Sequence, residues 1–219
     1  MEENTNSRVV YSQNVLEFVR VAAEYATFVE NVHRFSKKDV LDKLHTLMAL
    51  LYLKGTLLPK IDSNFEEANE QFVSEEEWQL IHDNIKTKLG YHDEYPELTD
   101  PTSHEAVEPS IASIADNIAD VYQDIKNFLS AYNMGNEEIM NDAIWECQMN
   151  FEEFWGQKLL NALKAIHPVY YGEDDLEEEE ENQNIEGWNE DNFEDIDTSN
   201  WILSKRQAAY KKERPDDEE

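Results

Sequence analysis

Cysteine is nearly absent from this sequence, since Cys147 is the single one among 219 residues. One cysteine excludes an internal disulfide and a zinc site built from several thiolates. Glycine is also scarce, at six residues, and no phosphate-binding loop, dinucleotide-binding fingerprint or nucleophile elbow occurs. Nothing in the sequence therefore supports a nucleotide-binding enzyme or a serine hydrolase.

Basic residues are few as well, with 18 Lys and Arg against 49 Asp and Glu and a net charge of -31. Such a field repels phosphates and acidic lipid surfaces, which excludes nucleic-acid binding and a basic membrane anchor. No apolar run approaches the roughly 18 residues of a membrane span. Residues 1–14 also lack the features of a signal peptide. We expect a cytoplasmic protein without membrane contact.

The charge distribution divides the chain near residue 172. Residues 173–219 carry 19 acidic and 5 basic side chains, and residues 173–197 carry 14 acidic side chains and no basic one. Self-repulsion and a shortage of apolar residues favour an extended or disordered stretch. The sequence therefore predicts a folded domain over residues 8–172 and an acidic C-terminal extension over residues 173–219.

The apolar residues of the first part recur at helical spacing. Over residues 15–29 they alternate between steps of four and three, which predicts an amphipathic helix with Ser12 as its N-cap. Four further stripes follow, with boundaries at Ser36, Ser74, Pro109, Gly135 and Pro168. No segment shows the alternation typical of strands. The sequence predicts an all-α, up-and-down bundle of about five helices with a partly irregular, acidic tail.

Residues 91–108 interrupt this pattern with two prolines and six acidic residues. Eighteen residues are long for a structureless connection inside a compact domain. The segment is therefore predicted to be either a functional loop or an irregularly packed one.

Five short segments of the first, second and last predicted helices carry a resemblance. They are EFV (17–19), EYATFVE (24–30), LLYLKGTLLP (50–59), WECQ (145–148) and FEEFWG (151–156). They resemble a family of uncharacterised helical proteins of Bacteroides-type bacteria, known as a domain of unknown function. The resemblance covers about residues 10–170 and implies an all-helical bacterial cytosolic domain. It supplies no activity, ligand or catalytic residue.

Acidic residues at helical spacing are the first candidates for a chemical site. Glu17 and Glu24 lie seven residues apart on the first helix, as do Glu146 and Glu153 on the last. Facing pairs would form a four-carboxylate box for a divalent metal or for acid–base chemistry. Solvated faces of a very acidic protein explain the same pattern, and we favour that interpretation.

Two motifs, Glu30-x-x-His33 and Asp42-x-x-His45, match the ligand pairs of di-metal sites in helical bundles. If the chain turns near Ser36, a rise of about 1.5 Å per residue separates the two imidazoles by roughly 9 Å along the axis. Metals of one binuclear site lie about 3.5–4 Å apart. We therefore interpret both histidines as interfacial, keep His33 as a minor candidate ligand, and expect no cofactor.

Two other features favour structural interpretations. Asp116, Asp120 and Asp124 form a row opposite an apolar stripe, which predicts a solvated face. Cys147 lies in an apolar row, which predicts a buried and inert thiol.

The acidic extension contains isolated large apolar residues, among them Trp188, Phe193 and Trp201. This pattern is typical of segments that fold when they dock in a groove. The groove belongs either to a partner protein or to the chain's own bundle, where basic residues of the segment 205–214 would pair with the acidic surface.

These features favour an accessory or interaction protein of the bacterial cytosol without catalysis of its own. A protein partner would bind the acidic tail, residues 91–108, or a groove lined by Tyr25, Trp145 and Trp155, although core packing is the simpler role for those aromatic residues. One alternative is a metal-dependent helical-bundle enzyme with a carboxylate site. Another is an acidic mimic of a nucleic-acid backbone.

Overall fold

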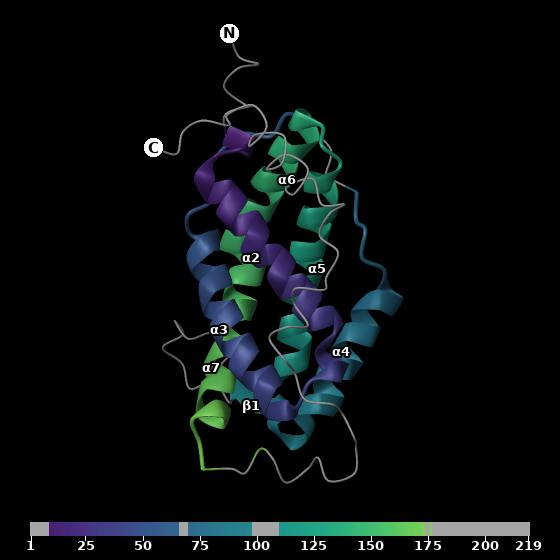
Figure 1. Ribbon diagram of the computed structural model, residues 1–219, viewed down its shortest axis with the longest axis vertical. Coiled ribbons are helices and arrows are strands. Elements are labelled where there is room, and N and C mark those ends of the chain that lie inside the picture. The colour runs from purple at the N-terminus through teal and green to yellow at the C-terminus, as the bar shows by residue number, and fades with distance from the viewer. Residues whose placement is uncertain (1–8, 66–69, 98–109, 174–175, 177–219) are drawn as a thin grey trace, which may run out of the picture.

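The computed structural model describes residues 9–65, 70–97, 110–173 and 176, and amphipathic helices form most of this part of the chain. The helices are α2 (Gln13–Glu30), α3 (Lys37–Gly55), α4 (Glu75–Leu89), α5 (Ile114–Asn133), α6 (Glu137–Asn150) and α7 (Gly156–Tyr170). A π-helix, Phe151–Trp155, joins α6 to α7 in one rod. Successive rods run in opposite directions along the long axis (Figure 1). The predicted all-α architecture is confirmed.

Serine side chains mark several helix starts. Ser36 and Ser74 accept hydrogen bonds from backbone N–H groups three residues later, as the sequence predicts. The predicted start of α5 at Pro109 was wrong, because Ser113 caps this helix and the four residues from 110 to 113 form a strand. The predicted stop at Pro168 was also wrong, since α7 continues through this proline to Tyr170.

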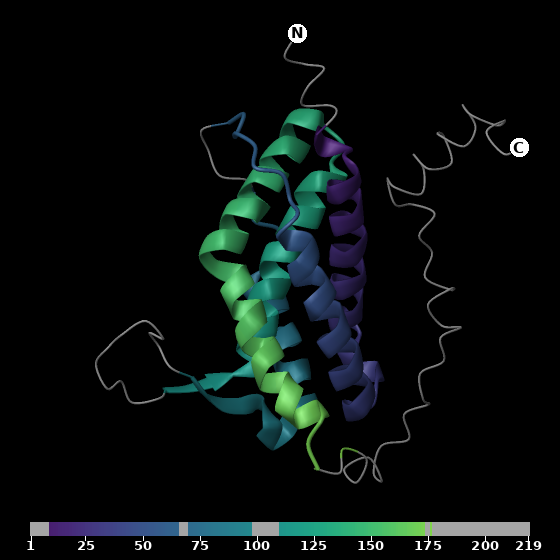
Figure 2. The same ribbon diagram turned by 90° about the vertical axis from the view of Figure 1, so that its left-hand side faces the viewer.

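A two-stranded antiparallel sheet lies between α4 and α5. Strand β1 (Glu94–Glu97) pairs with β2 (Ser110–Ser113), and Pro96 lies opposite Ile111. The ribbon projects sideways from one end of the bundle (Figure 2). The expectation of a chain without strands was wrong here, because four-residue strands are too short for a clear alternation.

Asp93 is a buried carboxylate that joins this hairpin to α5. It is 1% exposed and follows α4 in a short 3-10 helix, Gly90–Asp93. Its carboxylate accepts hydrogen bonds from Ser113 Oγ at 2.8 Å and from the Ala115 N–H at 2.7 Å. A negative charge is favourable at a helix N-terminus, so Asp93 fixes the direction in which the hairpin leaves the bundle.

Asp142 plays the same part for the connection between α3 and α4. This side chain is 2% exposed and accepts hydrogen bonds from the N–H groups of Asn64 and Phe65 at 2.7 and 2.8 Å. Ser63 Oγ donates a third at 3.2 Å. A buried carboxylate with several donors avoids the cost of unpaired burial, and the connection is thereby held against α6.

Trp155 lies at the centre of the core and is fully buried. Its ring centroid is 4.7 Å from that of Phe151 and 6.2 Å from that of Phe18 on α2. Its indole Nε1 donates a 3.0 Å hydrogen bond to the carbonyl oxygen of Cys147 on α6. The π-helix therefore directs one large side chain between several helices.

Two glycines leave room for the aromatic side chains of the π-helix. A Cβ atom on Gly55 would lie 2.9 Å from Trp155 Cη2 and 3.0 Å from Phe151 Cε2. A Cβ atom on Gly156 would lie 2.4 Å from the Phe151 carbonyl oxygen. Gly55 and Gly156 belong to the segments LLYLKGTLLP and FEEFWG that carry the family resemblance, so these segments contain the close packing around Phe151.

We expect Gly55→Ala to destabilise the fold by about 1–3 kcal/mol, because the added methyl group overpacks the Trp155 and Phe151 rings. Alanine normally stabilises a helix relative to glycine, so the sign of the effect is diagnostic. Urea unfolding measures it, with the exposed Thr46→Ala on the same helix as a control. A Gly55→Ala protein more stable than the wild type would contradict the close approach of Gly55 to the Trp155 and Phe151 rings.

Candidate functional site

The two predicted metal ligands on α2 form ion pairs with α3. Glu17 Oε2 lies 2.5 Å from Lys54 Nζ, and Glu24 Oε1 lies 3.2 Å from Lys43 Nζ. Hydrogen bonds from Lys54 and Gln13 to the carboxylate lower the pKa of Glu17. Both side chains therefore have a structural explanation as helix-to-helix tethers.

The other candidate ligands lie in different surroundings. Glu146 lines a small pocket on α6, Glu153 is exposed on the π-helix, and His33 is exposed on a short 3-10 turn after α2. Within residues 9–65, 70–97, 110–173 and 176, no three or more His, Cys, Asp or Glu side chains form a group that would hold a metal ion. The structure does not gather the five candidates into one site there.

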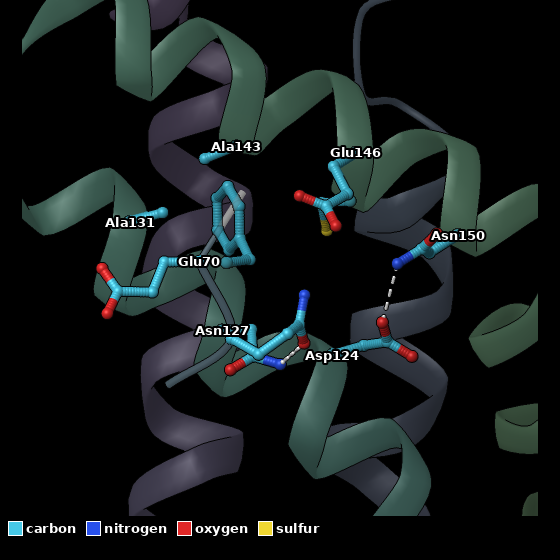
Figure 3. Close-up of a pocket in the computed structure, with 10 residues that line it drawn as sticks. Glu70, Asp124, Asn127, Ala131, Ala143, Glu146 and Asn150 are labelled. Carbon is cyan, nitrogen blue, oxygen red and sulfur yellow. Dashed lines mark hydrogen bonds between the residues drawn. The ribbon is translucent and has the colours of Figure 1, made fainter. Parts of the chain in front are cut away.

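The pocket that contains Glu146 lies between α5 and α6, beside the segment that precedes α4 (Figure 3). Its volume is about 20 Å³, which is room for about one water molecule. It is lined by Glu70, Gln71, Asp124, Asn127, Phe128, Ala131, Ala143, Glu146, Cys147 and Asn150. Carboxylate, amide and thiol groups thus meet in a space too small for a substrate.

Asp124 is the titratable group of this pocket with the clearest perturbation. Burial raises its pKa to about 6, and the nearby carboxylates of Asp120 and Glu146 add to the rise. A 2.8 Å hydrogen bond from Asn150 Nδ2 to Asp124 Oδ1 acts in the opposite direction (Figure 3). A carboxyl group with this pKa would exchange protons near neutral pH.

The interpretation of the Asp116, Asp120 and Asp124 row as a solvated face needs correction. Asp120 accepts a hydrogen bond from Trp78 Nε1 at 3.1 Å and pairs with Lys158 at 2.9 Å. Together with the partly buried Asp124, this residue faces neighbouring helices. Asp120 and Asp124 therefore have tethering roles that their position opposite an apolar stripe did not indicate, whereas Asp116 is exposed, as predicted.

Cys147 is buried beside the same pocket, as the sequence predicts. Burial, and then the charges of Asp124 and Glu146, raise the pKa of its thiol well above the usual value. The thiolate is the reactive form of cysteine. This environment therefore opposes a nucleophilic role.

Asn127 forms the remaining polar wall. Its Oδ1 accepts hydrogen bonds from the N–H groups of Phe72 and Val73 at 2.8 and 3.0 Å, and its Nδ2 donates to Gln71. The amide thus fixes the chain just before α4. Since these contacts join residues more than 50 positions apart, no local sequence pattern would have revealed them.

A second hollow, of about 200 Å³, lies between α2 and α5. It is lined by Val19, Ala23, Ala26, Thr27, Glu30, Lys126, Leu129, Ser130 and Asn133. Glu30 binds Lys126 Nζ at 2.5 Å and accepts a 3.0 Å hydrogen bond from Tyr122 Oη. Small apolar side chains and one ion pair therefore define this groove.

The aromatic residues proposed for a binding groove divide between the core and its edge. Tyr25 and Trp155 are fully buried, and Tyr25 Oη donates to the Ile118 carbonyl oxygen at 3.1 Å. They pack the core, whereas Trp145 is half-buried. The predicted docking residues Trp188, Phe193 and Trp201 lie outside the described residues.

Comparison with known proteins now places the chain in a family. The model of a family described as a domain of unknown function, DUF5063, matches residues 9–172. The chain belongs to this family. The match to DUF5063 confirms the resemblance carried by the EYATFVE, LLYLKGTLLP and FEEFWG segments. The description of the family assigns no activity.

This DUF5063 chain is similar to a solved structure from Bacteroides fragilis, the crystal structure of protein BF1032. The two share 36% identity with a TM-score of 0.68, over 76% of this chain and 98% of the other. About a quarter of the present chain therefore has no counterpart in it. No protein with a curated description matches. No helix among the described residues has the length and apolar character to cross a membrane.

We expect Asp124→Asn to stabilise this DUF5063 protein at pH 7.5 by about 1–2 kcal/mol and to have little effect near pH 4. The pKa of Asp124 is about 6 in the folded chain, against about 3.9 in an unfolded one. The folded chain thus binds more protons between these values, so its stability falls as the pH rises through this window. The asparagine would still accept the hydrogen bond from Asn150.

Urea unfolding at the two pH values measures this effect. The exposed Glu153→Gln on the π-helix is the matched control and is expected to stay within about 0.5 kcal/mol of the wild type. An Asp124→Asn gain of equal size at both pH values would contradict the raised pKa.

Proposed function

We propose that this protein is an accessory protein of the bacterial cytosol that binds another protein and has no catalytic activity of its own. The observation that carries the proposal is the β1–β2 hairpin, which projects from the bundle (Figure 2) and exposes Pro96 and Ile111. Strand β1 lies within residues 91–108, the segment singled out in the sequence as a long connection, and β2 begins two residues after that segment ends.

The two faces of this hairpin have different surroundings. Tyr95 Oη accepts a 2.7 Å hydrogen bond from Asn117 Nδ2 on α5, and Glu97 accepts one from Asn161 on α7. These contacts hold the inner face against the bundle. Side chains alternate between the faces of a strand, so Pro96 and Ile111 share the outer face, where Ile111 is 70% exposed.

The edges of the hairpin offer a second means of recognition. Among the described residues the sheet contains two strands, so each strand has one edge without a neighbouring strand. Partner peptides commonly add to such edges through main-chain hydrogen bonds, with side-chain contacts supplying specificity. Pro96 lacks an N–H group, which makes the edge of β2 the better acceptor of a partner strand.

The interior supports a binding role over a catalytic one. The perturbed carboxyl of Asp124 faces a cavity of about 20 Å³, and the only cysteine is a buried thiol with a raised pKa. Glu17 and Glu24, which the enzyme alternative requires, are paired with lysines. Glu17 and Glu24 thus have structural partners, and the cavity that Asp124 lines is too small for a substrate.

We expect Ile111→Asp to abolish capture of a specific partner from a lysate of the native host, because it replaces the exposed apolar side chain of the hairpin with a charge. Eluates of the full-length chain and its variants would be compared by quantitative mass spectrometry. Leu80→Asp is the matched control, since Leu80 is 60% exposed on α4. Circular dichroism would verify that both variants keep the wild-type helix content.

A partner that binds the wild type and Leu80→Asp, and is lost with Ile111→Asp, supports the hairpin as the interface. Equal capture by all three proteins would move the interface elsewhere. Absence of any partner, together with turnover of a substrate that requires Asp124, would contradict the proposal and favour an enzyme.

A further inference from the structure

Two histidines from different helices meet toward one end of the bundle. His45 on α3 and His167 in the last turns of α7 are 122 positions apart in the sequence, yet His45 Nε2 lies 3.4 Å from His167 Nδ1. Their ring centroids are 5.6 Å apart. His45 is half-buried and His167 is exposed, so solvent and ions reach the pair.

The separation of the two nitrogens matches that of two ligands on one metal ion. Zinc–imidazole bonds are about 2.0–2.1 Å long, and tetrahedral angles then place two ligating nitrogens about 3.3–3.4 Å apart. A hydrogen bond between two nitrogen atoms is usually shorter, near 3.0 Å. The observed 3.4 Å therefore fits a chelating pair better than a direct hydrogen bond.

The surrounding side chains orient the imidazoles and favour a positive charge. The Tyr170 ring stacks on His45 with centroids 5.5 Å apart, and Tyr170 Oη donates a 2.6 Å hydrogen bond to Asp42 Oδ1. Tyr171 packs its ring against both histidines. Asp42 precedes His45 by three residues and lies on the same side of α3, so its charge is near the pair.

We propose that His45 and His167 bind one divalent transition-metal ion, of the zinc type, between α3 and α7. Neutral imidazole suits zinc, cobalt, nickel and copper. Water would fill the two remaining positions of a tetrahedral ion, because the Asp42 carboxylate is held by the hydrogen bond from Tyr170 Oη. The net charge of -31 raises the local concentration of cations around the whole protein.

Such an ion would stabilise the fold by joining α3 to α7. α7 ends at Tyr170, three residues after His167, and the strongly acidic part of the sequence starts at residue 173. A metal bound to both helices would hold the last turns of α7 against α3. Ligands that bind only the folded state stabilise it by mass action, so the melting temperature would rise with metal concentration.

Isothermal titration of the untagged full chain with Zn²⁺ tests the site, and Co²⁺ provides an absorption spectrum that reports ligand number. We expect one ion per chain and a rise in melting temperature. We expect His45→Gln and His167→Gln each to weaken binding at least tenfold. His33→Gln is the matched control, because His33 is exposed on a separate turn, and it should bind within about twofold of the wild type.

Three results would overturn the proposal: no saturable binding of either metal, affinities unchanged by His45→Gln and His167→Gln, or a loss of binding with His33→Gln as large as theirs. Melting temperatures of the metal-free variants separate loss of a ligand from loss of the fold. The result is independent of the partner-binding test, since Ile111 lies on the hairpin and contributes no ligand.

Discussion

The packing of Trp155 between the helices is the constraint on which the bundle depends. This side chain contacts α2 through Phe18, lies beside Gly55 at the end of α3, and donates a hydrogen bond to a carbonyl of α6. The π-helix Phe151–Trp155 places it there. Because Gly55 leaves room for the Trp155 and Phe151 rings, α7 can pack against α3.

Carboxylates form a second layer of structural control in this very acidic chain. Asp93 accepts hydrogen bonds at the start of α5, Asp142 holds the α3–α4 connection, and Glu30 joins α2 to α5. Each is satisfied by donors from another part of the chain, which is how buried acidic groups are accommodated. Many of the acidic residues therefore serve the fold, and their number alone indicates no chemical activity.

The two surface features with a proposed role lie toward the same end of the molecule. The β1–β2 hairpin projects there, and α7 ends there with His167 and Tyr170 (Figure 2). A rigid bundle that presents an arm at one end is well suited to protein recognition, because the binding element is positioned by the core. A metal between α3 and α7 would stiffen the same end.

Local patterning in the sequence determined the all-α class, the helix starts at Ser36 and Ser74, and the burial of Cys147, because helix periodicity and caps depend on residues only a few positions apart. The sequence segments around Gly55 and Gly156 were also sufficient to indicate the family. Only the tertiary structure decided which distant residues meet. The pairing of His45 with His167, the anchoring by Asp142 and the pocket at Asp124 each join segments brought together by helix packing, which no local pattern specifies.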